Sequence, residues 1–487
     1  MLKQINIYRR HLGAAYFVVL ATLTLSACIH TLTNDTLVPL MSLREEVEVG
    51  RLQHPRMLAT FGGAYDDRAL DQYVGELTVR LMERSGAPNA VRSVTVLNSP
   101  SVNAFALPGG YIYVTRGLLA LASDEAELAT VIAHEIGHVE ARHPAKRIAH
   151  LARAEALDRP SGRIIGREQA DFITSLGSKA YVAHYSRTQE LEADKLGILA
   201  ASKSGYDPRA ALTFLEAMER DQAFQTALLR KNKSHASEGD YMTAHPPTPA
   251  RVEAARHVVG TINTGGLRRR SEYLSHLDGV IYGDTPQNGV VRERRFFHPL
   301  LGFTFTFPEE YVIHTRPSAI VAIGEGNKLI LFDGIEIDAT NSLEAFVEHD
   351  WAPTLAIKTL DRMWIDGLEV VSAYVPLVHR DVRLIAIRFN KTKIYRFIVI
   401  DAPSTLATFD GEVALLANSF RRLSADEVLA VKPLRIKIRT VRDGDTVESL
   451  ASTMPFATDR GRRFRILNNL DKNSRIFPGQ SVKLIAD

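Results

Sequence analysis

The sequence predicts an α+β protein of several domains, and three stretches of the chain carry this prediction. An apolar stretch with helical periodicity covers residues 124–138, strand-like segments follow from about residue 296, and short strand and helix patterns return in residues 436–487. A chain of 487 residues is expected to form two to four domains. We therefore expect an α-rich domain with a small sheet, then an α/β domain, then a small βααβ domain.

The composition is that of an ordinary globular protein, with 45% hydrophobic and 24% charged residues. The formal net charge of +3 comes from 59 basic and 56 acidic residues. Lys3, Arg9 and Arg10 in the N-terminal segment account for that excess. Because the remainder is neutral, charge gives no reason to expect a nucleic-acid partner.

Residues 134–138 read His-Glu-Ile-Gly-His. On a helix, the i, i+4 spacing places His134 and His138 one turn apart on one face, where both imidazoles can bind one Zn²⁺. Glu135 lies beside the first of them and can reach a water in an open metal position. Ser123 or Asp124 can cap such a helix. The alternative is a buried helix that happens to carry two histidines.

A second helical stretch, residues 186–197, carries Glu190 and Asp194 one turn apart. A site with two histidines needs a third protein ligand, and a carboxylate from another helix would leave the fourth position to water. Asp194 can accept the free N–H of a ligand histidine. Glu192 competes, but it points about 160° away from Asp194 around a helix. The alternative is a solvated acidic face.

Together these segments resemble the M48 metallopeptidases. HEIGH at 134–138 is followed by SRTQELEAD at 186–194 and preceded by NAFALPGGYIYV at 103–114, in the family's order, and the resemblance covers roughly residues 45–260. It implies a zinc metalloendopeptidase with one Zn²⁺ per chain and protein or peptide substrates. It assigns Glu190 as the third ligand and Asp194 as the Asp of the E-x-x-x-D element. Glu135 would then be the general base that deprotonates a zinc-activated water.

The stretch 103–114 predicts a strand hairpin beside this helix. Pro108-Gly109-Gly110 is a turn signal, and residues 111–115 are β-branched and aromatic. With residues 94–97 they suggest a small antiparallel sheet. An edge strand there could hold an extended substrate by backbone hydrogen bonds; the alternative is a core hairpin. The substrate-strand candidates are Asn103, Ala104 and Phe105.

The transition-state oxyanion needs a hydrogen-bond donor, for which the candidates are His184, Tyr185, Arg187 and His245. His245 lies in a proline-rich turn after a polar stretch, 221–245, that we expect to be a surface loop. M48 members carry a comparable His-Pro segment near the site. A fourth protein ligand there would displace the catalytic water and keep the enzyme latent until the loop moved. The alternative is a capping or turn histidine.

The N-terminus predicts export. Residues 12–25 form an apolar run that follows a basic segment and is too short to span a membrane, as in a signal peptide. Leu25-Ser26-Ala27-Cys28 resembles the lipobox of bacterial lipoproteins, in which the cysteine is acylated. Cys28 is the single cysteine of the chain, which excludes an internal disulfide. Because residue 29 is Ile rather than Asp, the resemblance favours a lipid anchor on the periplasmic face of the outer membrane. The alternatives are an ordinary cleaved signal peptide with an incidental cysteine and a soluble periplasmic protein.

We expect five segments along the chain. They are a lipoprotein signal peptide at 1–27, the M48-like zinc metallopeptidase domain at 28–262, a linker rich in Gly, Arg, Asn and Ser at 263–295, an α/β domain of unknown role at 296–425, and a small domain at 436–487. The last of these resembles a LysM module, with GDT at 444–446, LN at 467–468 and PGQ at 478–480. LysM modules are βααβ domains that in many proteins bind glycans such as peptidoglycan.

Two functions of different classes remain open at this point. One is a zinc endopeptidase that degrades misfolded or unassembled cell-envelope proteins. The other is an envelope assembly scaffold or chaperone with an idle or latent zinc site, docking through its C-terminal domains. Glu135 favours the first, because a purely structural zinc site has no use for a base beside its ligands.

Overall fold

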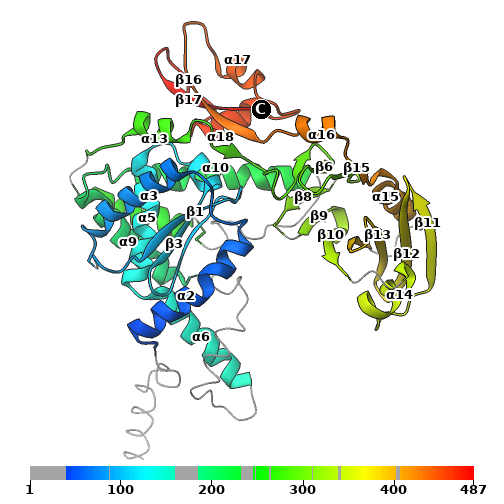
Figure 1. The fold of residues 1–487 in the computed structure, drawn as a ribbon. Coiled ribbons are helices and arrows are strands. Elements are labelled where there is room, and N and C mark those ends of the chain that lie inside the picture. Colours follow the sequence, from blue (N-terminus) through cyan, green and yellow to red (C-terminus); the bar gives the residue numbers. More distant parts are fainter. Residues whose placement is uncertain are drawn as a thin grey trace, which may run out of the picture.

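The computed structural model describes residues 40–86, 88–158, 185–231, 245–246, 248–262, 265–309, 311–317, 319–337, 342–401 and 406–487. Cys28, the expected signal segment and His184 lie outside these ranges. Within them, no helix combines the length and apolarity needed to cross a membrane. Figure 1 shows a helical part, a sheet-rich part to one side of it, and the C-terminal strands and helices packed on top of the helical part.

The helical part surrounds one central helix, α5 (Glu125–Glu140), which carries the HEIGH segment. Every residue of α5 from Glu125 to His138 is buried, as expected for a helix that is apolar on most of its faces. The other helices of this part are α2 (Leu43–Thr60), α3 (Arg68–Met82), α4 (Arg116–Leu121), α6 (His143–Asp158), α9 (Arg187–Lys203), α10 (Ala210–Lys231) and α12 (Pro249–Gly260), of which α3, α6, α9 and α10 pack directly on α5. Helix α10 continues to Lys231, so the surface loop expected at 221–245 was wrong for its first half; residues 232–244 lie outside the described ranges.

A three-stranded sheet lies against α5, with strand order β1-β3-β2. Strands β2 (Ala104–Leu107) and β3 (Tyr111–Thr115) form the expected antiparallel hairpin around Gly109 and Gly110, which both have positive φ. Strand β1 (Ser93–Leu97) pairs with β3 in parallel, so the fully antiparallel sheet was a wrong prediction. The reason is topological: β2 lies on the far side of β3, and the chain returns to the same direction only in β3.

The segment 263–295 is not a linker. It contains α13 (Arg270–Leu277), β4 (Ile281–Tyr282) and β5 (Val290–Arg292), and β6 (Arg295–His298) begins at its end. Tyr273, Leu274 and Leu277 form a buried face of α13 in the same hydrophobic core as α5. The polar composition of the segment concealed this face, whose three apolar positions follow helical spacing.

The sheet-rich part contains a seven-stranded sheet of order β11-β12-β13-β14-β10-β9-β8 and a four-stranded sheet of order β15-β7-β6-β5. All pairings in both are antiparallel, so this part is α+β rather than the expected α/β. Its strands are β7 (Phe303–Thr306), β8 (Val312–Thr315), β9 (Ala319–Ile323), β10 (Leu329–Glu336), β11 (Thr359–Ile365), β12 (Leu368–Leu377), β13 (Arg380–Arg388), β14 (Lys393–Asp401) and β15 (Arg421–Arg422). Its helical segments are η2 (Glu325–Asn327), α14 (Leu343–Ala345), η3 (Phe346–Trp351) and α15 (Leu406–Ser419), and α16 (Ala425–Ala430) follows.

The C-terminal elements run strand–helix–helix–strand: β16 (Leu434–Thr440), α17 (Val447–Ser452), α18 (Arg460–Leu467) and β17 (Ser481–Ala486). β16 pairs with β17, and β4 adds a third strand at the other side of β16. Their apolar side chains join the core around α5 instead of forming a separate one. The buried Nζ of Lys483 donates to the carbonyls of Ala120 and Ala122, at 2.6 and 2.7 Å. These elements are therefore docked on the helical part beside the N-terminal end of α5 (Figure 1).

Candidate metal centre

Helix α5 begins with a hydrogen-bonded cap. The Asp124 carboxylate accepts from the backbone N–H of Glu127 (3.0 Å), and the Glu127 carboxylate accepts from the backbone N–H of Ser123 (2.8 Å). These reciprocal bonds satisfy backbone donors that a buried helix end would otherwise leave unpaired. The cap sets the start of the helix, so that His134 and His138 fall on one buried face, as their spacing predicted.

The structure brings both histidines together with Glu190 of α9 and His245. Each of the four offers a ligand atom, all four atoms lie within 4.8 Å of one another, and all four residues are buried. The Nε2 atoms of His134 and His138 are 3.0 Å apart, and Glu190 Oε1 lies 3.5 Å from His138 Nε2. The predicted ligands are thus adjacent in space although α9 follows α5 by about fifty residues along the chain.

These atoms fit a bound zinc ion. Three imidazoles and one carboxylate are nitrogen and oxygen donors of the kind that zinc prefers. Two ring nitrogens that face each other at 3.0 Å need either a shared proton or a cation between them. Both carboxylate oxygens of Glu135 are buried and accept no hydrogen bond from the described part of the chain. Glu135 thus lies beside the ligand group with no hydrogen bond from the described residues that would tie its carboxylate to another role in the fold.

Helix α9 presents its carboxylates as the sequence predicted. A capping box between Ser186 and Gln189 starts the helix, and Glu190 then occupies its first turn. Asp194 Oδ1 lies 2.9 Å from His134 Nδ1, and the Nε2 of that ring faces the centre. Glu192 points away from Glu190 and Asp194, and its side chain is 52% exposed.

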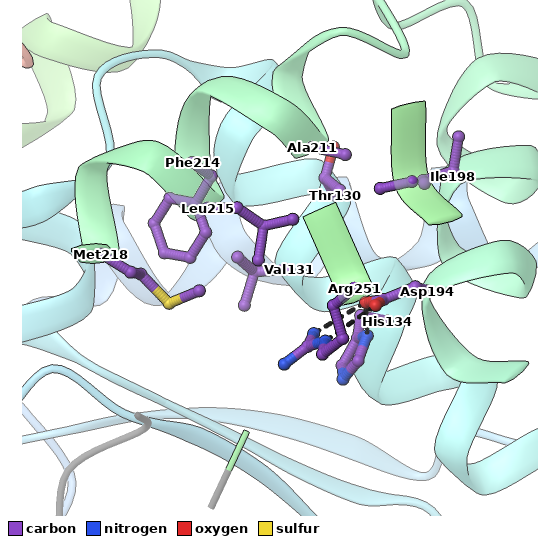
Figure 2. Close-up of a pocket in the computed structure, with 11 residues that line it drawn as sticks. Thr130, Val131, His134, Asp194, Ile198, Ala211, Phe214, Leu215, Met218 and Arg251 are labelled. Atoms are coloured by element: carbon purple, nitrogen blue, oxygen red, sulfur yellow. Dashed lines mark hydrogen bonds and ion pairs between the residues drawn. The ribbon is translucent and has the colours of Figure 1, made fainter. Parts of the chain in front are cut away.

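Arg251 is a member of the site that the sequence patterns did not predict. It is 2% exposed, it forms a double hydrogen bond with Asp194 (2.7 and 2.8 Å), and its Nη1 lies 2.9 Å from Glu190 Oε2. Figure 2 shows Arg251, Asp194 and His134 side by side, with dashed lines that mark the interactions of Asp194 with Arg251 and His134. Two buried carboxylates one turn apart require a cation, and that requirement was the available signal.

His245 is fully buried against the three other ligand residues. Its Nδ1 lies 2.8 Å from Glu190 Oε1, and its Nε2 lies 3.6 Å from Glu135 Oε1. Arg251 Nη1 donates to the backbone carbonyl of His245 at 2.8 Å. The arginine that holds the α9 carboxylates therefore also holds this turn.

Charge compensation shifts the pKa values of the carboxylates and histidines of the site. Burial alone would raise the pKa of Glu190, but the neighbouring histidines lower it well below its usual range. Arg251 and His134 have the same effect on the pKa of Asp194. Burial lowers the pKa of His138 well below its usual range, which favours the neutral form of the ring that metal binding requires. Burial raises the pKa of Glu135, which has no cation in hydrogen-bond contact.

Among the described residues, the structure reduces the number of candidates for the hydrogen-bond donor to the oxyanion. Arg187 is exposed, whereas the buried ring of Tyr185 stacks on His138 with centroids 3.9 Å apart. The guanidinium of Arg147, on α6, lies 4.2 Å from the centre of the same ring. Like Arg251, Arg147 was not predicted from the sequence. It lies outside the recognised motifs, and no residue pattern indicated it.

The substrate-strand candidates lie at the edge of the small sheet. β2 is the terminal strand in the order β1-β3-β2, and it packs against α5. The side chains of Asn103, Ala104 and Phe105 are all buried, and Phe105 stacks on Tyr113 with centroids 4.8 Å apart. The side chains thus belong to the core, and the backbone edge of β2 is the part that could meet a substrate.

Comparisons with known proteins agree with this site. Residues 68–259 match the family model described as Peptidase family M48. The mitochondrial metalloendopeptidase OMA1 of Arabidopsis thaliana is 35% identical over 153 residues, which are 31% of this chain and 28% of that protein. The beta-barrel assembly-enhancing protease of Escherichia coli is 28% identical over 226 residues, which are 45% of this chain and 44% of that protein.

The chain spans less than half the length of both curated relatives. Among solved structures, that of cyanobacterial PsbP from Synechocystis matches 29% of this chain and 98% of that one. Its identity of 16% and TM-score of 0.22 support no conclusion.

The matched segment contains all four members of the buried ligand group. The chain therefore contains a metalloendopeptidase domain that uses zinc. Within that class, residues 68–259 are similar to peptidase family M48.

Proposed function

We propose that this protein is a zinc-dependent endopeptidase in which His134, His138 and Glu190 hold the ion and Glu135 is the general base. The convergence of the three ligand side chains beside the buried carboxylate of Glu135, which accepts no hydrogen bond from the described residues, carries this proposal. A structural zinc site is closed by four ligands and has no use for such a carboxylate.

Bound zinc would lower the pKa of a water molecule and polarise the carbonyl of the peptide bond to be cleaved. Glu135 would take the proton as the water attacks and then pass it to the leaving amine. Asp194 would keep His134 in the tautomer whose Nε2 is free, since it accepts from Nδ1 at 2.9 Å. The Tyr185 hydroxyl would donate to the developing oxyanion, because its buried ring stacks directly on His138 of the ligand group.

We propose further that the site is latent while His245 occupies it. A fourth protein ligand leaves no open position, and catalysis by zinc requires one. His245 lies 2.8 Å from Glu190 and 3.6 Å from Glu135, so it fills the space that water and substrate would need. This arrangement also favours the second candidate function, an envelope assembly scaffold or chaperone with an idle site.

We propose the bacterial cell envelope as the place of action, with misfolded or unassembled envelope proteins as substrates. The expected lipid anchor at Cys28 and the similarity to a protein named beta-barrel assembly-enhancing protease support this location. Residues 436–487 would bind peptidoglycan as a LysM-like module; their strand–helix–helix–strand order and the 64% exposed side chain of Phe477 support this role. Loss of cosedimentation with peptidoglycan in Phe477→Ala would be its first test.

The first experiment measures zinc content and casein degradation for the chain from residue 29 onward, wild type beside Glu135→Gln. Equal zinc with cleavage only by the wild type is the expected result. Undiminished turnover in Glu135→Gln would overturn the assignment of the base. Equal zinc with no cleavage by either protein would favour latency or scaffolding. Glu140→Gln is the matched control, because Glu140 is on the same helix but contacts Gly86 instead of the site.

A further inference from the structure

The two histidines of the HEIGH segment are oriented in the same way. Each turns its Nε2 toward the centre, and these two atoms are 3.0 Å apart. Each therefore has its Nδ1 on the side away from the ligand group. A neutral imidazole that binds a metal through Nε2 carries its proton on Nδ1, and that N–H needs an acceptor when it is buried. For His134 the acceptor is Asp194, at 2.9 Å.

The corresponding partner of His138 is another histidine. His138 Nδ1 lies 2.9 Å from Nδ1 of His143, the first residue of α6, and His143 is fully buried. His143 Nε2 lies in turn 3.3 Å from Glu192 Oε2. Glu192 is the carboxylate that points away from the ligand group, and its outer end is exposed. His138, His143 and Glu192 thus form a row of side chains in contact that runs from the ligand group to solvent.

The positions of the ring protons in this row of side chains follow from the groups at its two ends. The carboxylate oxygen of Glu192 is the acceptor of its contact with His143, so the proton of a neutral His143 is on Nε2. Nδ1 of His143 then has a free lone pair and accepts from His138 Nδ1–H. With its proton on Nδ1, His138 has the lone pair of Nε2 available to the ion. The reverse assignment would leave His138 Nε2 protonated and unable to bind a metal.

The turn between α5 and α6 holds His143 in place for this contact. Arg142 has a φ of 57°, a left-handed conformation that is unfavourable for a residue other than glycine. Its Nε donates to Glu46 Oε1 at 2.7 Å, and Nη2 donates to the carbonyl of Met41. Helix α2 thus fixes the turn that directs the His143 ring toward His138.

We propose that His143 is a positioning residue for the zinc ligand His138, and that Glu192 sets the tautomer of His143. This inference rests on the proposed function, because it takes His138 as a ligand. All three carboxylates of α9 then act on the centre. Glu190 binds the ion, Asp194 orients His134 directly, and Glu192 orients His138 through His143. Neither His143 nor Glu192 touches the ion or the substrate.

The test is zinc affinity, measured by competition with a chelator on the chain from residue 29 onward. His143→Leu removes the acceptor at similar volume, and we expect zinc to bind roughly 10–100-fold more weakly. His143→Gln keeps an acceptor oxygen and should recover a substantial part of this loss. Glu192→Gln should weaken binding by less than His143→Leu, since its carboxamide oxygen still accepts from His143. His150→Gln, an exposed histidine on the same helix, is the control and should bind zinc like the wild type.

A spectroscopic readout separates positioning from a general loss of packing. In nitrogen-15 spectra of zinc-loaded protein, His138 of the wild type should be the Nδ1–H tautomer with a strong hydrogen bond, and that signal should change in His143→Leu and return in His143→Gln. Wild-type affinity in both His143→Leu and Glu192→Gln would overturn the proposal, as would equal losses in His143→Leu and His143→Gln. A wild type that binds no zinc would instead overturn the proposed function. If His143→Leu fails to fold, His143→Gln and Glu192→Gln still decide by the His138 signal.

Discussion

Gly197 of α9 lies directly against the backbone of His134 on α5. A β-carbon at Gly197 would be 2.7 Å from the His134 backbone nitrogen and 2.9 Å from its Cα. Gly137 of α5 approaches α9 from the other side, where a β-carbon would lie 3.1 Å from the Ala193 carbonyl oxygen. The two helices therefore meet backbone to backbone. This close packing is what lets Glu190 and Asp194 reach the histidines of the neighbouring helix.

Gly197→Ala should separate the two helices. The atoms in its way are backbone atoms, which cannot rotate aside, so we expect a loss of about 1–3 kcal/mol in the free energy of unfolding, typical of overpacking. Zinc binding should weaken as well, because Glu190 moves with α9. Urea unfolding in the presence of chelator and chelator competition for zinc measure the two effects.

Gly75→Ala is the control for this substitution. Gly75 is also helical, in α3, but nothing lies within 4 Å of its β-carbon position. Alanine there should stabilise the protein by about 0.5–1 kcal/mol, the helix-propensity difference. Equal effects of Gly197→Ala and Gly75→Ala would show that the helices do not meet as described.

Arg251→Gln should destabilise the protein even without zinc. The change removes the cation that two buried carboxylates share, and breaking such a buried pair typically costs about 3–5 kcal/mol. Thermal unfolding in chelator measures this loss. Arg256→Gln removes an exposed arginine that pairs with Glu253 on the same helix and should change stability by less than about 1 kcal/mol. Similar melting temperatures for the two variants would contradict the role given to Arg251.

His245→Ala should activate the enzyme. The variant frees the space beside Glu190 and Glu135, and zinc keeps three protein ligands and an open position. If the wild type is open about 10% of the time, casein turnover should rise about tenfold. Turnover at or below the wild-type level with zinc still bound would contradict latency.

Lys483 should make stability depend on pH. Burial lowers its pKa to about 7 in the folded protein, against about 10.4 in an unfolded chain. Between these values the unfolded chain holds a proton that the folded protein lacks, so the free energy of unfolding rises with pH by about 1.4 kcal/mol per unit. This stability is lost as the pH falls from about 10 to about 7, below which both states are protonated.

Lys483→Met should remove that slope between pH 7 and 9, where urea unfolding can compare it with the wild type. Neutral lysine has two N–H groups for the two carbonyls it contacts, those of Ala120 and Ala122. Lys437→Met, at an exposed position on β16, is the control and should keep the wild-type slope. Parallel pH profiles for all three proteins would rule out a buried, titrating Lys483.

Local patterns predicted the elements that carry the site, because a helix places residues i and i+4 together whatever surrounds it. His134 with His138 and Glu190 with Asp194 could be recognised for that reason. The patterns gave wrong predictions where strand pairing or helix packing depends on residues that are far apart in the sequence. The direction of β1 relative to β3 depends on the path of the chain between them. The buried face of α13 was concealed in a polar segment, and the integration of β4 with β16 joins residues more than 150 positions apart.

Spacing along two helices was enough to select the residue types that could bind zinc and act on a peptide bond, since that information is local. How these residues are supported is a property of the tertiary structure alone. Arg251 neutralises two carboxylates, His143 and Glu192 lie in line behind His138, and His245 closes the fourth side of the group. These contacts join segments from four helices and a turn, and no local pattern encodes them. They form because buried charges and buried N–H groups each require a partner, and packing alone decides which one is in reach.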